Sequence, residues 1–253
     1  MRKSRGSLRH LKRSPAPSFW QIMRKERVWT VKPMPGPHPI WRCIPLGILL
    51  RDYLKLAETM KEARRILGEG QIKVDGRVRR DYKYPTGLMD VVEIVTIEEF
   101  YRIVPHRQKF LWPLKIEPEE AKLKLCRIEN KVTVKGGHIQ LNLHDGRNIL
   151  IRVSNPMAPE EDVYRTLDSV LIEIPDQNIV DHIKLDIGTM VVVIDGRNVG
   201  RLGKVKSITP VFKRKNYLVE LEDPSGNKFS TVLKYIFPVG IDAPLITVSG
   251  EQV

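Results

Sequence analysis

The side chains of this sequence best suited to binding a ligand are lysines and arginines, and seven of them fall between Thr59 and Arg80. Lys61, Arg64 and Arg65 are spaced so that a helix would place them on one face. Such a face can hold several phosphates. Only two acids accompany Glu62 in this run, which favours nucleic acid over the alternative, a solvated helix surface. The expected contacts are Lys61, Arg64, Arg65, Lys73, Arg77, Arg79 and Arg80.

The first 32 residues carry more positive charge, with ten basic residues and one acid, Glu26. Pro15 and Pro17 break any helix there, while Phe19 and Trp20 add aromatic surface that can stack on exposed bases. We therefore expect an extended RNA-binding arm rather than an organelle transit peptide, which would be an amphipathic helix. Because it has little apolar surface to bury, the arm is expected to be disordered without RNA. Its expected contacts are Arg2, Lys3, Arg5, Arg9, Lys12, Arg13 and Trp20.

The stretch from Met190 to Ile208 has the pattern of a buried strand, a loop with three glycines, and a second strand starting near Lys204. Its spacing resembles the KOW motif, a strand–loop–strand piece of SH3-like barrels. Arg197, Arg201 and Lys204 could contact RNA, but KOW barrels also bind protein, so both options stay open. A further basic tip is formed by Lys213, Arg214 and Lys215.

Residues that could support catalysis or bind a metal occur singly. Cys43 and Cys126 make neither a zinc-ligand set nor a disulfide framework, so both are expected in cores. His38 has no ligand partner nearby in sequence. His144 and Asp145 suggest catalysis, but no nucleophile or glycine-rich loop accompanies them, and an Asp-Gly hairpin turn with an exposed histidine is the better interpretation. We therefore expect no enzyme, no metal, no cofactor and no small-molecule substrate.

The elements that must position the first cationic set are a helix and a hairpin. Thr59 and Glu62 form a capping box, which predicts a helix start, and apolar residues at helical spacing continue to Leu67. Glycines at 68 and 70 predict its end. Apolar residues then alternate over 72–74, and Asp75-Gly76 is the dipeptide that a two-residue hairpin turn prefers.

Further elements follow from the same rules. An apolar stripe predicts a helix over 44–56, and Pro118 with acids after it and lysines later predicts another over 118–125. Alternation predicts a hairpin from 139 to 153 with a turn at Asp145-Gly146, a strand over 170–174, and a strand over 217–221 followed by a turn at 223–226. The barrel is expected to close by Val239.

Length and composition bound the class of protein. The 253 residues are enough for more than one domain. The formal charge of +13, with 42% hydrophobic residues, indicates packed cores and an anionic partner, nucleic acid before membrane surface. No apolar run approaches the roughly 18 residues of a membrane-spanning helix, and no signal peptide is visible, so we expect no membrane and a reducing cytosol.

Several of these motifs resemble known families. Residues 63–64, 70 and 72–77 fit the S4-like RNA-binding domain, with Asp75 where that family usually has Asn. More specifically, residues 6–20 resemble the N-terminal signature of the small-subunit ribosomal protein S4e family, although Ser14 and Pro15 depart from it. This resemblance adds His10 to the expected RNA contacts. Similar S4e elements lie at residues 36–38, 84–91, 116–121 and 144–147.

The resemblance implies a multidomain α+β protein. The expected parts are a basic extended arm and linker (1–40), a small α/β S4-like RNA-binding domain (41–104), a mostly-β middle domain (105–186), and an SH3-like β-barrel with the KOW motif and a short tail (187–253). The long basic C-terminal extension of eukaryotic members is absent, which indicates an archaeal type.

The implied function is structural: a constituent of the small ribosomal subunit, in the cytoplasm, that binds and stabilises small-subunit rRNA beside neighbouring ribosomal proteins. Specificity would come from RNA shape and loops. The alternatives are a ribosome-assembly factor, a KOW-type elongation factor, or a pseudouridine-synthase-like modification enzyme. That last class carries a Gly-Arg-Leu-Asp motif, and the nearest string here, residues 165–168, misses it.

Overall fold

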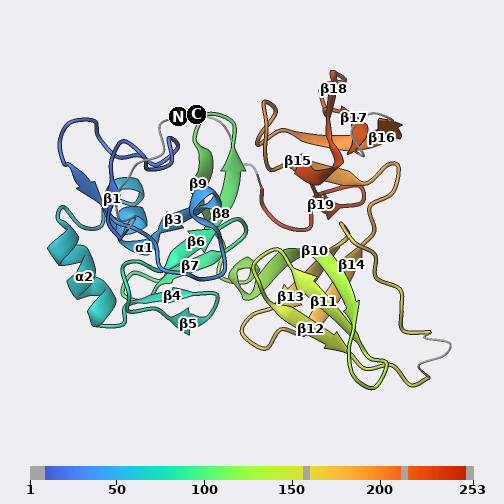
Figure 1. The fold of residues 1–253 in the computed structure, drawn as a ribbon, viewed down its shortest axis with the longest axis horizontal. Coiled ribbons are helices and arrows are strands. Elements are labelled where there is room, and N and C mark those ends of the chain that lie inside the picture. The colour runs from blue at the N-terminus through green and yellow to red at the C-terminus, as the bar shows by residue number, and fades with distance from the viewer. Residues whose placement is uncertain (1–8, 156–159, 212–215, 249–253) are drawn as a thin grey trace.

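The computed structural model describes residues 9–155, 160–211 and 216–248 (Figure 1). The described part of the N-terminal segment is folded. Strand β1 (Leu11–Lys12) pairs antiparallel with β2 (Trp29–Thr30), and Trp20, between them in sequence, is buried. The prediction that the arm has little apolar surface to bury, and is therefore disordered without RNA, is wrong for these residues, because Trp20 and its apolar neighbours join the core around α1 (Leu46–Ile48) and α2 (Met60–Gly68).

The predicted helix and hairpin are confirmed. Helix α2 (Met60–Gly68) is capped by Thr59, whose Oγ1 accepts from the Glu62 N–H at 3.2 Å, while the Glu62 carboxylate accepts from the Glu58 N–H at 2.9 Å. Strands β4 (Ile72–Val74) and β5 (Arg77–Val78) follow. Asp75 and Gly76 both have positive φ, 50° and 73°, as a two-residue type I′ turn requires.

The predicted helix over 44–56 is too long at both ends. After a 3₁₀ turn, η1 (Ile40–Arg42), the chain forms strand β3 (Cys43–Pro45), which pairs with β6 (Pro85–Gly87). The helix comprises only α1 (Leu46–Ile48) and the π-helical turn η2 (Leu49–Tyr53). The physical reason lies in Pro45, since a residue before proline avoids the helical region and Ile44 is therefore extended.

Three five-stranded antiparallel sheets make up most of the molecule. The first, called here the hairpin sheet, has the order β5-β4-β7-β8-β9 and adds β7 (Val91–Ile94), β8 (Glu99–His106) and β9 (Phe110–Ile116). The expected domain boundary at 104/105 falls inside β8. Residues up to 116 thus share a sheet with the predicted hairpin.

The middle sheet has the order β12-β11-β10-β13-β14. Its strands are β10 (Leu123–Thr133), β11 (Ile139–Leu143), β12 (Asn148–Ile151), β13 (Ser169–Glu173) and β14 (Ile179–Ile183). The predicted hairpin of β11 and β12 and the predicted strand β13 are confirmed. The predicted helix over 118–125 is wrong: only the 3₁₀ turn η3 (Glu120–Lys122) forms, because Leu123 onward pairs with β13 and tertiary pairing overrides local preference.

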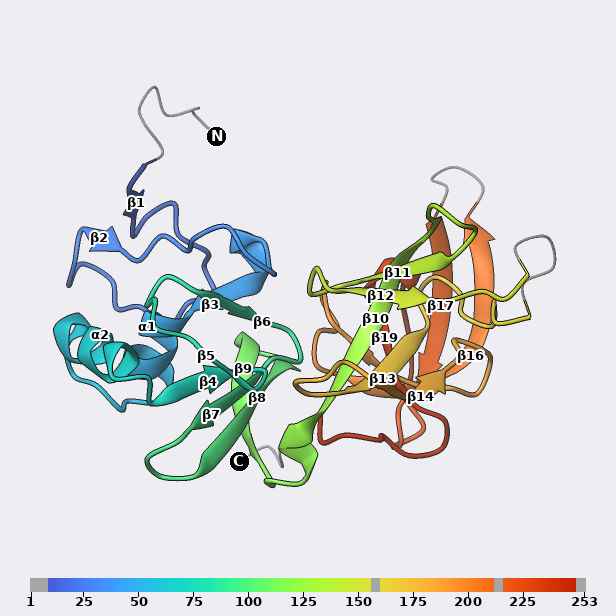
Figure 2. The ribbon, with the colours of Figure 1, turned by 90° about the horizontal axis from the view of Figure 1, so that it is seen from below.

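The C-terminal sheet has the order β18-β17-β16-β15-β19. It comprises β15 (Met190–Val193), β16 (Leu202–Val211), β17 (Asn216–Glu222), β18 (Lys228–Val232), the 3₁₀ turn η4 (Leu233–Tyr235) and β19 (Ile236–Gly240). The hairpin sheet with α2 lies on one side of the molecule, and the middle and C-terminal sheets lie on the other (Figures 1 and 2). No helix in the described ranges is long and apolar enough to span a membrane.

Candidate nucleic-acid interface

The three cationic residues of α2 are all exposed, as the helix pattern predicts. Lys61 has no ion pair with a described residue. The Arg64 guanidinium carbon lies 4.0 Å from the centre of the Tyr82 ring, a cation–π contact that fixes its direction. Arg65 pairs with Glu69 one turn later at 3.0 Å, on the surface, where screening by water keeps the pair weak. The helix therefore presents positive charge to solvent.

The hairpin residues divide into two kinds. Lys73 is neutralised, because its Nζ lies 2.8 Å from the Glu93 carboxylate on the adjacent strand. Arg77 and Arg80 are exposed and form no ion pair with a described residue. Arg79 is half-buried, with its guanidinium carbon 4.4 Å from the centre of the Tyr84 ring. The hairpin thus keeps three of its four predicted cations available to an anion.

A groove of about 570 Å³ joins the N-terminal segment to α2, and it is called here the N-terminal groove. Arg9, His10 and Arg64, three of the predicted contacts, line it together although more than fifty residues separate the last from the others. Trp29 also lines the groove and is 57% exposed. Its ring contacts His10 edge-on and lies 5.4 Å from Lys12 Nζ. An exposed aromatic ring among cations suits stacking on a single-stranded base.

Two predictions on the N-terminal segment are corrected. Trp20 is 2% exposed and its Nε1–H donates to the Cys43 carbonyl at 2.8 Å, so it is a core residue and cannot stack on a base. Arg13 is half-buried and donates from Nε and Nη2 to the Ile22 carbonyl, which gives it a structural part. The apolar run of Phe19, Trp20 and Ile22 was the available signal. The predicted contacts Arg2, Lys3 and Arg5 lie outside the described residues.

The predicted contacts of the C-terminal loop lie on another part of the molecule from α2 (Figure 1). Arg197 is exposed. Arg201 pairs with Asp223 and lies over the Phe229 ring at 4.3 Å, and Lys204 Nζ lies 3.1 Å from the Asp242 carboxylate. Two of the three are therefore already paired within the protein. The basic tip of Lys213, Arg214 and Lys215 lies outside the described residues.

A buried ion cluster, which the sequence did not predict, joins the hairpin sheet to the middle sheet. Lys124 on β10 is fully buried, and its Nζ donates to Asp75 at 2.8 Å and to Asp90 at 2.6 Å and lies 2.9 Å from an Asp145 oxygen. Arg147 bridges Asp75 and Asp145 at 2.5 and 3.1 Å. The carboxylates come from the β4–β5 turn, the segment before β7 and the β11–β12 turn, so no spacing in the sequence could reveal them together.

These contacts set the charge states of the cluster. Burial would raise the pKa of Asp90, but the charges of His38 and Lys124 and hydrogen bonds from both hold that pKa far below its usual range. Burial opposes ionisation of Asp145 too, yet Lys124, His144 and Arg147 lower its pKa to about 2. Burial would lower the pKa of Lys124, and the carboxylates around it raise that pKa well above its ordinary value. Asp90, Asp145 and Lys124 are thus charged near neutral pH. Burial, together with the charge of Asp90, raises the pKa of Asp75 even though Lys124 and Arg147 act in the opposite direction.

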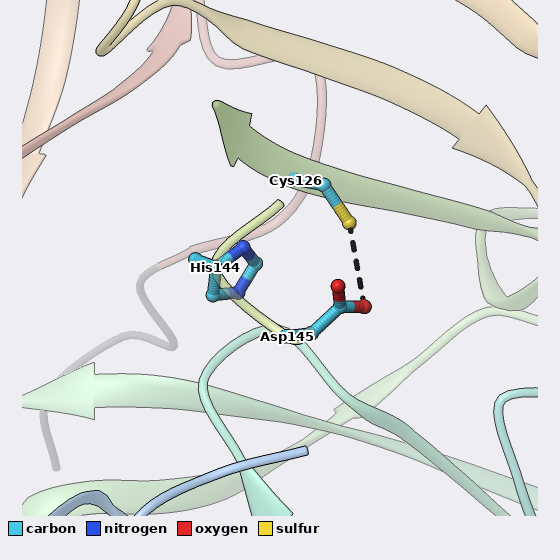
Figure 3. A group of neighbouring side chains, drawn as sticks. All are labelled: Cys126, His144 and Asp145. Carbon is cyan, nitrogen blue, oxygen red and sulfur yellow. Dashed lines mark hydrogen bonds between the residues drawn. The ribbon is translucent and has the colours of Figure 1, made fainter. Parts of the chain in front are cut away.

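Cys126, His144 and Asp145 lie close enough to suggest a metal site (Figure 3). Their lone pairs are used elsewhere. His144 Nδ1 accepts from the Arg127 N–H at 3.2 Å, and Nε2 lies 3.1 Å from the Leu88 carbonyl, to which it can only donate. Asp145 faces Lys124 and Arg147, and burial raises the pKa of the Cys126 thiol. This set is a packed hydrogen-bonding group, unsuited to a cation.

The prediction of an exposed His144 is wrong. It is half-buried, and burial with the nearby Lys124 and His38 lowers its pKa to about 4 even though Asp145 acts in the opposite direction. His144 is therefore neutral at pH 7. His38 is buried too, with Nε2 3.1 Å from both Asp90 oxygens. Cys43 and Cys126 are both buried, which confirms the prediction that they are core residues.

Three family models match the chain in order. The RS4NT (NUC023) domain matches residues 5–40, the S4 domain matches 48–92, and the model described as Ribosomal family S4e matches 97–179. Together they cover the N-terminal groove, α2 with its hairpin, and the larger part of the middle sheet.

Similar proteins extend the match to almost the whole chain. The Small ribosomal subunit protein eS4 of Staphylothermus marinus is 58% identical, with 95% of this chain and 96% of the relative covered. Its counterpart from Methanocaldococcus jannaschii is 46% identical over 96% of this chain and 98% of the relative. The crystal structure of the 30S ribosomal protein S4e from Thermoplasma acidophilum superimposes with a TM-score of 0.65 at 32% identity, over 79% of this chain and 95% of that chain.

Proposed function

The chain belongs to the ribosomal S4e family, and we propose on this basis that it is a structural constituent of the small ribosomal subunit that binds and stabilises small-subunit rRNA. The observation that carries this conclusion is the 58% identity, over 95% of the chain, to a protein named as a small ribosomal subunit protein. Neighbouring small-subunit proteins are the expected protein partners, and the ribosome in the cytoplasm is the expected location.

The RNA face is assigned to α2, the exposed hairpin arginines and the N-terminal groove. The exposed cations of these elements, Lys61, Arg64, Arg65, Arg77 and Arg80, supply phosphate contacts, and Trp29 with His10 offers a stacking surface. Arg9, which also lines the groove, is assigned a phosphate contact. The match of the S4 domain to residues 48–92 supports this placement.

The C-terminal sheet is proposed to be an SH3-like barrel that carries the KOW motif. Support comes from its strand order, in which β15 lies between β16 and β19, and from the glycine-containing loop between β15 and β16. Because Arg201 and Lys204 are already paired, we assign RNA contact here to Arg197 first. We also propose that the chain divides near residues 40, 116 and 186, in keeping with the extents of the three sheets.

We assign the protein no catalytic step. The string nearest to the pseudouridine-synthase motif ends at Asp168, which is 2% exposed. Its carboxylate accepts from the N–H groups of Arg165 and Leu185 and lies 2.9 Å from His182 Nε2. A carboxylate held in this way by its own fold is used for structure and is not presented to a base.

The proposal is tested by competition binding. The purified full chain is titrated with labelled small-subunit rRNA while unlabelled tRNA or large-subunit rRNA is added in excess. Binding to small-subunit rRNA that persists against both competitors, and that weakens linearly with the logarithm of salt concentration, is expected. Equal displacement by tRNA would indicate general polyanion binding and contradict the proposed function.

A further inference from the structure

A cleft of about 330 Å³ lies where the linker, the hairpin sheet and the middle sheet meet, and it is called here the junction cleft. Its lining comes from the linker at Gly36, the hairpin at Arg77 and Arg79, the β11–β12 turn at Arg147, and the turn after β13 at Gln177. Gly76 of the hairpin turn approaches the turn after β13 so closely that an added Cβ would lie 3.1 Å from Ile174. The walls are thus held together by direct packing.

The charges around the junction cleft are unbalanced. Two acids, Asp75 and Asp145, line it, and both are saturated by the ion cluster. Asp75 also accepts the Val91 N–H at 3.0 Å, and Asp145 accepts the Arg147 N–H at 3.1 Å. Arg77 and Arg79 remain without a carboxylate among the described residues. An anion is therefore the ligand that this cleft attracts.

Arg79 is prepared for such a ligand. Its guanidinium is held over the Tyr84 ring, and both residues line the cleft. Its Nε is buried without a hydrogen-bond partner among the described residues. A guanidinium that is fixed in direction and short of acceptors loses little freedom when it binds a phosphate. Arg77 is exposed beside it and can bind a second oxygen of the same group.

We propose that the junction cleft binds a backbone phosphate of one nucleotide of rRNA, held by Arg77 and Arg79. Its volume is at the lower end of pockets for small ligands, so it admits a single nucleotide and excludes a helix of RNA. This inference rests on the proposed function and adds a specific seat between two sheets. A nucleotide bound there contacts both the hairpin and the middle sheet, so RNA binding reinforces their arrangement.

The test uses the full chain and small-subunit rRNA substituted with 4-thiouridine, which forms cross-links to protein on irradiation. Mass spectrometry then maps the cross-linked peptides. We expect cross-links on peptides that contain Tyr84 or Gln177, besides those on the N-terminal groove and α2. Replacing Arg77→Gln and Arg79→Gln together should abolish the cleft cross-links and leave the others. It should also flatten the slope of log affinity against log salt by about one for each phosphate that is no longer bound.

The matched control removes two exposed arginines of the middle region outside the cleft, Arg152→Gln with Arg165→Gln, and should leave the cleft cross-links in place. Arg77→Gln alone, at an exposed position, serves if the double variant does not fold. In a parallel experiment, inorganic pyrophosphate is added before irradiation. If it prevents only the cleft cross-links, phosphate is the group that the cleft recognises. Retained rRNA binding without cleft cross-links, or cleft cross-links that survive the double substitution, would overturn this inference alone. If the unsubstituted chain does not bind small-subunit rRNA at all, the proposed function is contradicted as well.

Discussion

Lys124 holds together side chains from three separate segments of the chain. It is fully buried, and three carboxylates surround its ammonium group within 2.9 Å. A buried charge is tolerated only when it is paired and hydrogen-bonded. The buried carboxylates are therefore stabilised by Lys124, and this ion cluster lies where the hairpin sheet and the middle sheet meet.

Replacing Lys124→Met should destabilise the protein by about 3–5 kcal/mol, because it leaves buried carboxylates without their main partner. The measurement is the free energy of unfolding in urea at pH 7. Lys115→Met is the control, since Lys115 forms an exposed pair with Glu99 and should change stability little. A Lys124→Met variant as stable as the control would show that the cluster does not hold the two sheets together.

Substitution of Arg64 and Arg65 tests whether α2 belongs to the RNA face. Both are exposed on α2, and neither is needed by the core. Arg64→Ala with Arg65→Ala should weaken binding to small-subunit rRNA and reduce the salt slope by about one for each phosphate that the variant no longer binds. Thermal unfolding should be nearly unchanged. An unchanged salt slope, compared with an Arg152→Ala and Arg165→Ala control, would place the binding face elsewhere.

At the scale of elements, the junction between the β4–β5 turn and the β11–β12 turn makes stability depend on pH. His144 has a pKa near 4 in the folded protein against an ordinary 6.5, so the unfolded chain takes up the proton first. Its contribution is complete above pH 6.5 and is lost as pH falls toward 4. Each such proton gives a slope of at most about 1.4 kcal/mol per pH unit. Asp145, with a pKa of about 2 against 3.8, extends the loss below pH 4.

We therefore expect His144 to lower the urea midpoint from pH 7 to pH 4, while the raised pKa of Asp75 acts in the opposite direction and makes the fall smaller. His144→Gln retains an amide that can donate and accept hydrogen bonds but does not titrate, and it should flatten the curve between pH 6.5 and 4. An equal slope in the variant would contradict the lowered pKa of His144.

The N-terminal segment is a second element with a clear test, because its two tryptophans are placed oppositely. Trp20 is in the core, whereas Trp29 is 57% exposed in the N-terminal groove. Trp20→Ala should cost about 3–5 kcal/mol of stability and open the segment to protease. Trp29→Ala should leave stability nearly unchanged and weaken RNA binding. The opposite pattern, with Trp29→Ala destabilising and Trp20→Ala neutral, would contradict the docking of this segment.

The sequence predicted correctly those elements that are determined by residues close together in the chain. The capping box, the end of α2 and the Asp75-Gly76 turn depend on residues a few positions apart, and the structure has them as predicted. The helix predicted over 118–125 does not form, because Leu123 onward pairs with β13 about 50 positions away and Lys124 binds carboxylates that lie about 20 to 50 positions away. Trp20 was misplaced for the same reason, since its partner Cys43 lies 23 residues on.

At the scale of the whole molecule, the middle and C-terminal sheets share one core cluster with the segment before β7. Met89 before β7, Leu125 and Leu171 of the middle sheet, and Phe237 of β19 all pack together. Polar contacts also join these parts of the molecule. Arg127 of the middle sheet donates to the Lys234 and Ile236 carbonyls, and Arg42 pairs with Asp195 at 2.5 Å. The cationic surfaces are thus carried on a single packed body. Short motifs were enough to predict the family, but this packing could not be read from them.

Membership of the small ribosomal subunit is tested by sucrose-gradient fractionation of lysate from the source organism, with the protein quantified in every fraction at low and at high salt. We predict one copy for each mature small subunit, retained at low and at high salt. Presence only in light or precursor fractions, with loss at high salt, would contradict the claim and indicate an assembly or modification factor.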